Sequence, residues 1–178
     1  MNHLIVRIYI QKGISMRKKR TLRDLSRKEI KKMAEHYAYS PARCSAEYLA
    51  EKYYNVSVNT FRKAIEKAVI ESMVDRDTVY EMQKKASYNA YLHNGNPGKI
   101  RSIRHYDDLM EMRDSYMPSP KASVQLIEKL ANSNLSLEEF AAKEVYTAHF
   151  VRKILYYCIE EDLISTRIFD LLKEKMYF

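Results

Sequence analysis

The sequence predicts an all-α protein, and three observations support this fold class. Glycine and proline, which favour turns, are scarce, since the 178 residues contain 3 Gly and 4 Pro. Apolar residues recur at helical spacing through most of the chain. Serine or threonine stands where several of these periodic segments begin, in a position to cap the free amides of a helix. We expect two tandem three-helix units joined by a helical bridge.

The most informative stretch, residues 45–65, predicts two helices joined by a tight turn, which is a helix-turn-helix. Ala50 is small enough for two helices to approach closely, Val56 fills the turn, and Ser57 caps the second helix. We expect the second helix to continue to about Val74. Its buried stripe comprises Val58, Phe61, Ala64, Ile65, Ala68 and Val69.

The opposite face of this second helix carries residue types that contact phosphates and base edges in DNA. Asn59 and Lys63 are candidate base contacts, and Arg62 suits either a guanine or a phosphate. Thr60 and Lys67 are candidate backbone contacts, and the capping serine lies near the backbone. The predicted duplex contacts of this helix are therefore Ser57, Asn59, Thr60, Arg62, Lys63 and Lys67.

The positive charge of the chain is concentrated at its front. Of the net charge of +8, all lies in residues 1–40, which hold 11 Lys and Arg against 3 Asp and Glu; the remaining residues hold 20 of each. A basic arm ahead of a neutral body is typical of proteins that bind an acidic polymer and release its counterions. The alternative is a solvated basic face that aids solubility. The arm residues predicted to contact DNA are Arg17, Lys18, Lys19 and Arg20.

Four regions follow from these patterns: a basic arm (1–21), unit one (22–92), a loop with a bridging helix (93–120) and unit two (121–178). Ser26 and Glu29 form a capping box that begins the first helix of unit one, and Ser40-Pro41 ends that helix. A short strand is expected at residues 4–10. Residues 75–80 suit either the hairpin of a winged protein or the start of another helix, so small β wings remain open. The break at residues 93–99 marks a domain boundary nearby.

Unit two repeats the pattern of unit one. Five residues of unit one match residues 91 positions later in unit two. In unit one they are Ser45, Glu47, Leu49, Ala50 and Lys52, and in unit two they are Ser136, Glu138, Phe140, Ala141 and Lys143. After one deletion, which we place in the turn, the offset becomes 90. The residues of unit one that match at this offset are Ser57, Phe61, Arg62, Lys63, Ile65, Val69, Glu71, Met73 and Val74. Their counterparts in unit two are Thr147, Val151, Arg152, Lys153, Leu155, Ile159, Glu161, Leu163 and Ile164. An internal repeat of this kind predicts two similar units in tandem.

Both units resemble helix-turn-helix DNA-binding proteins, most closely the winged-helix reader heads of GntR-type repressors. In unit one the resemblance rests on Ala50, Val56, Ser57, Thr60, Arg62, Ala64 and Ile65. In unit two it rests on Ala141, Thr147, Arg152, Ile154, Glu160, Glu161, Leu163 and Ile164. It covers roughly 30 residues per copy, the size of a supersecondary motif, and implies a DNA-reading helix in this local fold.

The outer face predicted for unit two is more aromatic and more acidic than that of unit one. Phe150, Tyr156 and Tyr157 are candidate contacts for a protein partner or a second copy of the chain, because aromatic residues are enriched at interfaces. The alternative is that these three side chains pack against the C-terminal helix expected at residues 166–178.

The sequence argues against several other classes of protein. No apolar run approaches the roughly 20 residues that span a bilayer, and the opening residues lack the features of a signal peptide, so we expect a cytoplasmic protein. Cys158 lies on an apolar helix face, which favours a buried thiol over a disulfide with Cys44. No histidine pair has metal-binding spacing and no glycine-rich phosphate loop is present. We therefore predict no metal, no cofactor and no enzymatic activity.

Together these observations predict a protein that binds double-stranded DNA through the basic arm and the second helix of unit one, with transcription control as its use. Two alternatives remain open. One is an interaction or assembly adaptor in which the helix-turn-helix folds dock proteins. The other is an accessory protein in DNA packaging or recombination.

Overall fold

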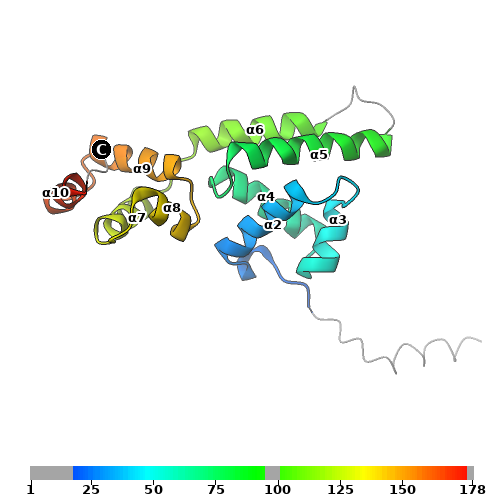
Figure 1. The fold of residues 1–178 in the computed structure, drawn as a ribbon, viewed down its shortest axis with the longest axis horizontal. Coiled ribbons are helices and arrows are strands. Elements are labelled where there is room, and N and C mark those ends of the chain that lie inside the picture. The colour runs from blue at the N-terminus through cyan, green and yellow to red at the C-terminus, as the bar shows by residue number, and fades with distance from the viewer. Residues whose placement is uncertain (1–17, 95–100, 176–178) are drawn as a thin grey trace, which may run out of the picture.

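The computed structural model describes residues 18–94 and 101–175, and in this part of the chain the predicted all-α fold is confirmed (Figure 1). The expected strand at residues 4–10 lies outside the described residues. Within the described ranges, the backbone pairs in β geometry at one isolated parallel bridge, between Arg20 and Val56. In chain order the helical elements are η1 (Leu22–Asp24), α2 (Arg27–Tyr39), α3 (Ala46–Leu49), η2 (Ala50–Tyr54), α4 (Val58–Ile70), α5 (Arg76–Asn94), α6 (Arg101–Ser115), α7 (Pro120–Ala131), α8 (Leu137–Glu144), α9 (Ala148–Glu160) and α10 (Thr166–Glu174).

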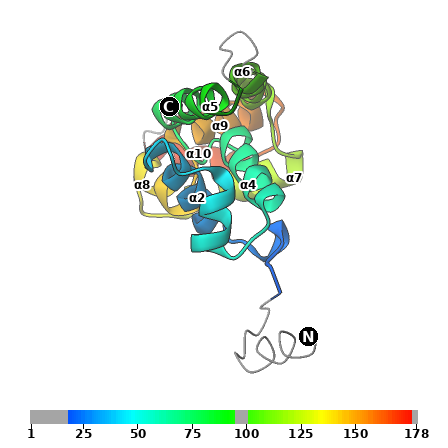
Figure 2. The ribbon, with the colours of Figure 1, turned by 90° about the vertical axis from the view of Figure 1, so that its right-hand side faces the viewer.

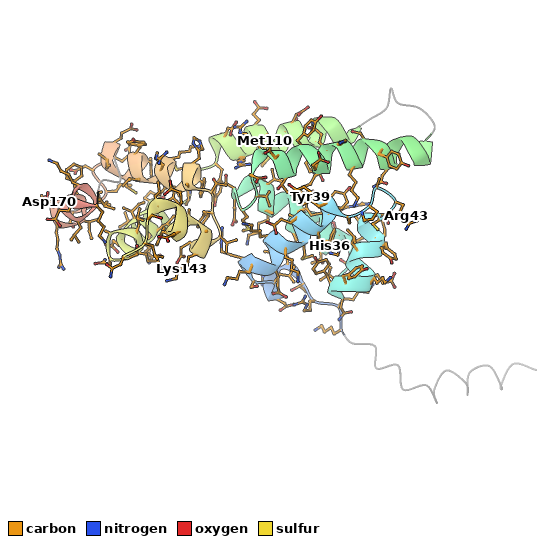
Figure 3. All side chains as sticks on the ribbon, in the orientation of Figure 1. His36, Tyr39, Arg43, Met110, Lys143 and Asp170 are labelled. Atoms are coloured by element: carbon orange, nitrogen blue, oxygen red, sulfur yellow. The ribbon has the colours of Figure 1, made fainter. Side chains whose placement is uncertain are left out.

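The helices form two groups that lie end to end along the long axis of the molecule (Figure 1). We call residues 18–115 the first half and residues 116–175 the second half. In the first half, α5 and α6 run side by side as one layer, with α2 and α4 beneath them (Figure 2). Arg43, near α3, and Asp170, on α10, mark the two opposite ends of the molecule (Figure 3).

Each half has its own hydrophobic core. The first is built around Phe61 and Met33, which are fully buried. The bridging helix α6 packs on α4 and α5 and contributes Tyr106 and Leu109 to this core. The second core is built around Phe150 and other buried residues of α9, packed against α7 and α8. The change from one core to the other therefore falls after α6.

The helix α4 ends at Ile70, four residues before the expected end. The amide of Ser72 donates to the carbonyl of Val69, at 3.0 Å, and the amide of Met73 donates to that of Ala68, at 2.9 Å. These two bonds form a Schellman motif. Ser72 occupies its left-handed position at φ 53°, where glycine is usual. The chain then enters α5, so of the two alternatives for residues 75–80 the start of another helix is confirmed.

The same ending recurs 90 residues later, at the end of α9. Asp162 has φ 50°, its amide donates to the carbonyl of Ile159 at 3.1 Å, and the amide of Leu163 donates to that of Cys158 at 2.9 Å. The following residues enter α10, so here too the described chain has no wing. In the described residues, helices therefore follow α4 and α9 where small β wings had been left open.

The extra residue of the first half lies in a helix, which corrects its expected position in the turn. The amide of Asn55 donates to the carbonyl of Ala50 five residues earlier, which makes η2 a π-helical turn. At the matching place in the second half, the amide of Val145 donates to the carbonyl of Ala141 only four residues earlier. A wider helical turn absorbs the insertion, so both connections still end in a left-handed residue.

Two lysines 90 positions apart cap the ends of α2 and α7. The ammonium of Lys85 donates to the carbonyls of Tyr37, at 2.8 Å, and Ser40, at 3.2 Å. That of Lys175 donates to the carbonyl of Ala131, at 2.6 Å, and to that of Ser133. Such cations satisfy helix C-terminal carbonyls that have no partner within the helix. Lys85 is buried, and this burial lowers its pKa.

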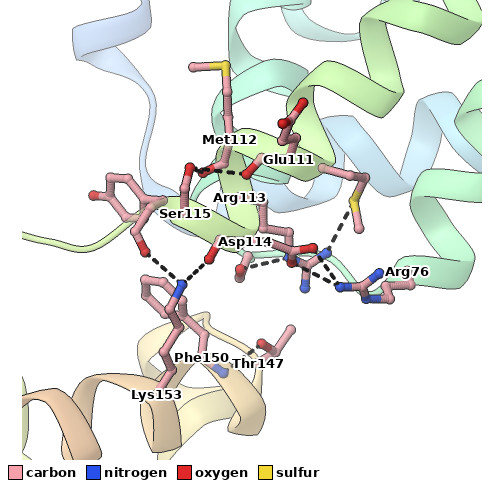
Figure 4. A network of polar contacts seen from close by, with 12 residues as sticks. Arg76, Glu111, Met112, Arg113, Asp114, Ser115, Thr147, Phe150 and Lys153 are labelled. Atoms are coloured by element: carbon pink, nitrogen blue, oxygen red, sulfur yellow. Dashed lines mark hydrogen bonds and ion pairs between the residues drawn. The ribbon is translucent and has the colours of Figure 1, made fainter.

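The two halves cap each other's helices where they meet. Arg27, at the start of α2, donates to the carbonyls of Glu144 and Val145 at the end of α8, at 3.3 Å each, and pairs with Glu71 at 2.7 Å. Its guanidinium also lies 4.0 Å from the centre of the Tyr146 ring. In the other direction, Lys153 of α9 donates to carbonyls at the end of α6 (Figure 4).

Two further observations concern features expected from the sequence. The described residues contain no helix that is both long and apolar enough to cross a lipid bilayer. Cys158 is a buried free thiol, as predicted, and Cys44 is also free. Burial raises the pKa of Cys158 to about 11.

The left-handed residues predict a contrast between two glycine substitutions. Asp162→Gly should raise the free energy of unfolding by about 1 kcal/mol, because glycine adopts this conformation without a side-chain clash. Ser72→Gly should bring no such gain, since Ser72 Oγ accepts a hydrogen bond at 2.8 Å from the buried Arg113. Urea denaturation of both variants measures the difference; equal stabilisation would contradict the role given to Arg113.

The contacts of Arg27 predict a large effect for Arg27→Met, which keeps most of the aliphatic stem. We expect a loss of about 2 kcal/mol in unfolding free energy, because two carbonyls and a partly buried carboxylate lose their donor. The neighbouring exposed residue Lys28 gives a matched control, and Lys28→Met should change stability by less than about 0.5 kcal/mol. Equal urea midpoints for the two variants would show that Arg27 does not hold the halves together.

Candidate nucleic-acid interface

The helix α4 presents one buried and one exposed face. Ser57 caps the helix by accepting from the amide of Thr60, at 3.0 Å. The buried face comprises Phe61, Ala64, Ile65, Ala68 and Val69, and each of these was predicted from the helical spacing. This packing orients the opposite face of α4 outward.

The six residues predicted to contact DNA occupy this helix in three different states. Asn59 and Lys63 are exposed, and neither side chain has a partner among the described residues. Arg62 is exposed but pairs with Glu47 of α3 at 2.6 Å. Lys67 lies 3.8 Å from Glu71. Ser57 and Thr60 share a hydrogen bond of 2.9 Å between their hydroxyls, so they serve the helix cap.

The described end of the basic arm, Lys18 to Arg20, which we call the basic segment, is attached beside the start of α4. Lys18 and Lys19 are exposed, whereas Arg17 lies outside the described residues. The amide of Arg20 donates to the carbonyl of Asn55 at 3.1 Å, and Arg20 and Val56 form the β-bridge. The basic segment is thus bonded to Asn55 and Val56, the two residues that precede the Ser57 cap.

Arg20 has a structural role in addition to its predicted contact with DNA. Its guanidinium pairs with Glu29 at 2.6 Å and donates to the carbonyl of Tyr54 at 3.3 Å. Glu29 also accepts from the amide and hydroxyl of Ser26, completing the predicted capping box. These donors, Arg20 above all, lower the pKa of Glu29 to about 2. Arg20 therefore anchors the basic segment to α2 and η2.

The bridging helix α6 borders the outer face of α4. His105 Nε2 lies 3.3 Å from Glu66 Oε1, and Arg113 meets Ser72 near the end of α4. These contacts place α6 along one side of α4. The exposed face of α4 is therefore narrower than the polar face that its sequence pattern indicates. Asn59 and Lys63 lie on the part that remains exposed.

The partner-contact residues predicted in the second half divide between core and surface. Phe150 is 2% exposed and stacks with the rings of Tyr116 and Tyr146, so its assignment as a partner contact is wrong. Its helical position faces the core because residues 116 and 146 pack over it. Tyr156 is 46% exposed, and Tyr157 is partly buried against the second core. Both line an open pocket of about 430 Å³ together with Met117, His149, Arg152, Lys153 and Glu160.

Corresponding lysines of α4 and α9 have different roles. Lys153 donates to the carbonyls of Asp114 and Tyr116, the latter at 3.3 Å, and so closes the end of α6 (Figure 4). Lys63, 90 positions earlier, has no such acceptor among the residues described and projects from the exposed face. The cation of α9 is thus used within the protein, while that of α4 is left for solvent or a ligand.

Three exposed residues of α3 and η2 are not among the contacts predicted from the sequence; they are Tyr48, Lys52 and Tyr53. The Tyr48 side chain is 43% exposed and that of Tyr53 is 55% exposed. The signal that marks them is the one-residue insertion relative to unit two. It shifts the end of this helix out of the α-helical register, so spacing alone misplaces the side chains.

Two further searches bear on the site. The described ranges hold no cluster of three or more His, Cys, Asp or Glu residues that could bind a metal ion. Comparison with protein-family models, with curated proteins and with solved structures finds no match to this chain.

The anchor at Glu29 predicts a pH-dependent stability. Because the pKa of Glu29 in the folded protein lies below the ordinary glutamate value of 4.5, the stabilisation is complete above pH 4.5 and is lost as pH falls through about 2. Glu29→Gln should therefore lower the Tm at pH 7, and the difference from the wild type should shrink on acidification.

Glu139 provides the control, because it forms the same capping box with Ser136 but has no arginine partner among the described residues. Glu139→Gln should cost less at pH 7 than Glu29→Gln when thermal unfolding is followed by circular dichroism. Equal losses would mean that Arg20 contributes nothing to the anchor.

Proposed function

We propose that this chain binds double-stranded DNA through the outer face of α4, in the manner of a helix-turn-helix protein. The main support for this proposal is that Asn59 and Lys63 are exposed on a helix whose start is bonded to the basic segment. In this arrangement α4 enters the major groove, and Lys18 and Lys19 neutralise phosphates beside it. Transcription control is the proposed use of such binding.

The connection between the helices supports this proposal. Asn55, Val56 and Ser57 form the whole link between η2 and α4, which matches the short turn of a helix-turn-helix. Val56 is buried in the first core and fixes the turn. The ion pair between Arg62 and Glu47 is exposed on both sides, so its free energy is small and Arg62 is available to a phosphate.

The second half is proposed as a diverged copy of the same unit with a different role. Its caps at Ser136 and Thr147, its Schellman ending and its capping lysine follow those of the first half at offsets of 90 or 91 residues. Its α9 carries Tyr156 and acidic Glu160 at an open pocket, which favours a protein partner or a second copy over DNA. An assembly adaptor, or an accessory role in DNA packaging or recombination, is the alternative use of this combination.

The proposal predicts the effect of removing the two cations of α4. Arg62→Ala combined with Lys63→Ala should weaken duplex binding on the order of tenfold or more, and should reduce the slope of log affinity against log salt by about 1 to 2. Fluorescence anisotropy with a pool of labelled duplexes, at several salt concentrations, measures both quantities.

The matched control removes two exposed cations elsewhere, Lys84 on α5 and Arg152 on α9. Lys84→Ala combined with Arg152→Ala should leave duplex affinity within about twofold, since these residues lie outside the proposed contact. Deleting residues 1–19, which spares Arg20 and its anchor, tests the arm separately. Equal losses in the two double variants would assign the binding to net charge and overturn the α4 site.

A further inference from the structure

Two exposed tyrosines and a lysine form one cluster on α3 and η2, which we call the Tyr-Lys-Tyr cluster (Tyr48, Lys52 and Tyr53). The centroids of the two rings lie 6.2 Å apart with the ring planes at 70°. The ammonium of Lys52 lies 4.8 Å from the Tyr48 centroid and 5.6 Å from the Tyr53 centroid, and contacts the Tyr48 hydroxyl. The cluster therefore combines aromatic faces with a positive charge at the surface.

The π-helical turn creates this cluster. In an α-helix, residues five apart point in different directions, whereas the wider π turn brings them closer to one face. The inserted residue thus places Tyr48 and Tyr53 together. The second half lacks both the insertion and the aromatics, because Glu139 and Glu144 stand 91 residues after Tyr48 and Tyr53. Single-turn π-helical insertions of this kind frequently occur at functional sites.

A second layer of aromatic contacts holds the exposed rings in place. The His36 ring lies edge-on to Tyr53 at 5.0 Å. His36 Nδ1 is 2.9 Å from the hydroxyl of Tyr54, a partly buried residue whose ring centroid lies 5.6 Å from that of Phe61 with the ring planes at 43°. Burial raises the pKa of Tyr54 to about 12. Tyr54 therefore anchors η2, and the neighbouring Tyr53 is left as an exposed face on a rigid support.

Exposed cations precede α3 and lie near the end of η2. Arg20 donates to the carbonyl of Tyr54, and the two residues before it, Lys18 and Lys19, are exposed. Arg43 is exposed just before α3 (Figure 3). Two of the nearby acidic residues are paired, Glu47 with Arg62 and Glu35 with Lys31, and Glu51 is exposed. The balance of charge favours an anionic ligand.

We infer that the Tyr-Lys-Tyr cluster binds single-stranded nucleic acid, with unpaired bases stacked on Tyr53 and Tyr48 and the phosphate backbone held by Lys52, Lys18 and Lys19. Aromatic faces flanked by cations are the combination that single strands require, because every base offers a face for stacking and every linkage a charge. Within a base-paired duplex the bases are not available to these rings. The inference goes beyond the proposed function and shares only the basic segment with it.

The absence of tryptophan from the sequence allows a direct test of stacking. Tyr53→Trp introduces the only tryptophan of that variant, at the cluster, and Tyr80→Trp places a single tryptophan at an exposed site on α5. Selective excitation of tryptophan separates its emission from that of the tyrosines. Titration with oligothymidylate of about 20 nucleotides should quench the emission of the first variant to saturation and leave that of the second unchanged. Unchanged Tyr53→Trp emission at saturating oligonucleotide would overturn the inference.

Affinities of alanine variants separate this site from that on α4. Tyr48→Ala combined with Tyr53→Ala should weaken binding of labelled oligothymidylate on the order of tenfold, whereas Tyr53→Phe, which keeps the ring, should stay within about twofold. Tyr80→Ala is the control for loss of an exposed ring, and thermal unfolding confirms that each variant is folded.

The duplex experiment makes the two failures distinguishable. The Tyr48→Ala, Tyr53→Ala variant should keep its affinity for duplex DNA, while the Arg62→Ala, Lys63→Ala variant should lose duplex affinity and keep most of its affinity for the single strand. Wild-type affinity of the tyrosine variant for oligothymidylate overturns the inference alone and points to a protein partner for the cluster. Loss of single-strand binding only, with duplex binding unaffected by the α4 variant, overturns the proposed function alone.

Discussion

The ends of the helices are the constraint on which the rest of this structure depends. The last carbonyls of a helix have no partner within it, and glycine is the usual residue that turns the chain to satisfy them. Here the left-handed positions are occupied by Asn55, Ser72, Val145 and Asp162. Cationic side chains from other elements complete the ends. Arg27 does this for α8 and Lys153 for α6, so the same bonds that finish the helices also join the two halves.

Val145 illustrates how tertiary contacts maintain an unfavourable local conformation. A β-branched residue at φ 62° is strained by roughly 1–2 kcal/mol. Its side chain is buried in the first core although it belongs to the second half, and its carbonyl accepts from Arg27. Burial and this hydrogen bond offset the strain. The end of α8 is thereby fixed against α2, and the orientation of α9 follows from it.

The two halves present different surfaces through small changes on a shared framework. Lys63 is exposed, whereas Lys153 closes a neighbouring helix, so only the first half leaves this cation for a ligand. One inserted residue converts the end of α3 into a π turn and exposes two aromatic rings beside the basic segment. In the second half the corresponding positions are acidic. The nucleic-acid contacts that we propose are therefore confined to the first half by local differences in sequence.

The sequence alone determined the all-α class, the buried stripe of α4 and the caps at Ser26 and Ser57, because these depend on spacing and on bonds between residues three or four apart. Contacts between distant residues decided the rest. Arg20 appears basic and free in the sequence, but Glu29 and Tyr54 bind it; Phe150 lies on a face that Tyr116 and Tyr146 cover. The π turn also escaped prediction, because helical periodicity assumes a constant number of residues per turn. Only the tertiary structure could decide which cations and rings remain exposed, since exposure depends on what packs against each residue.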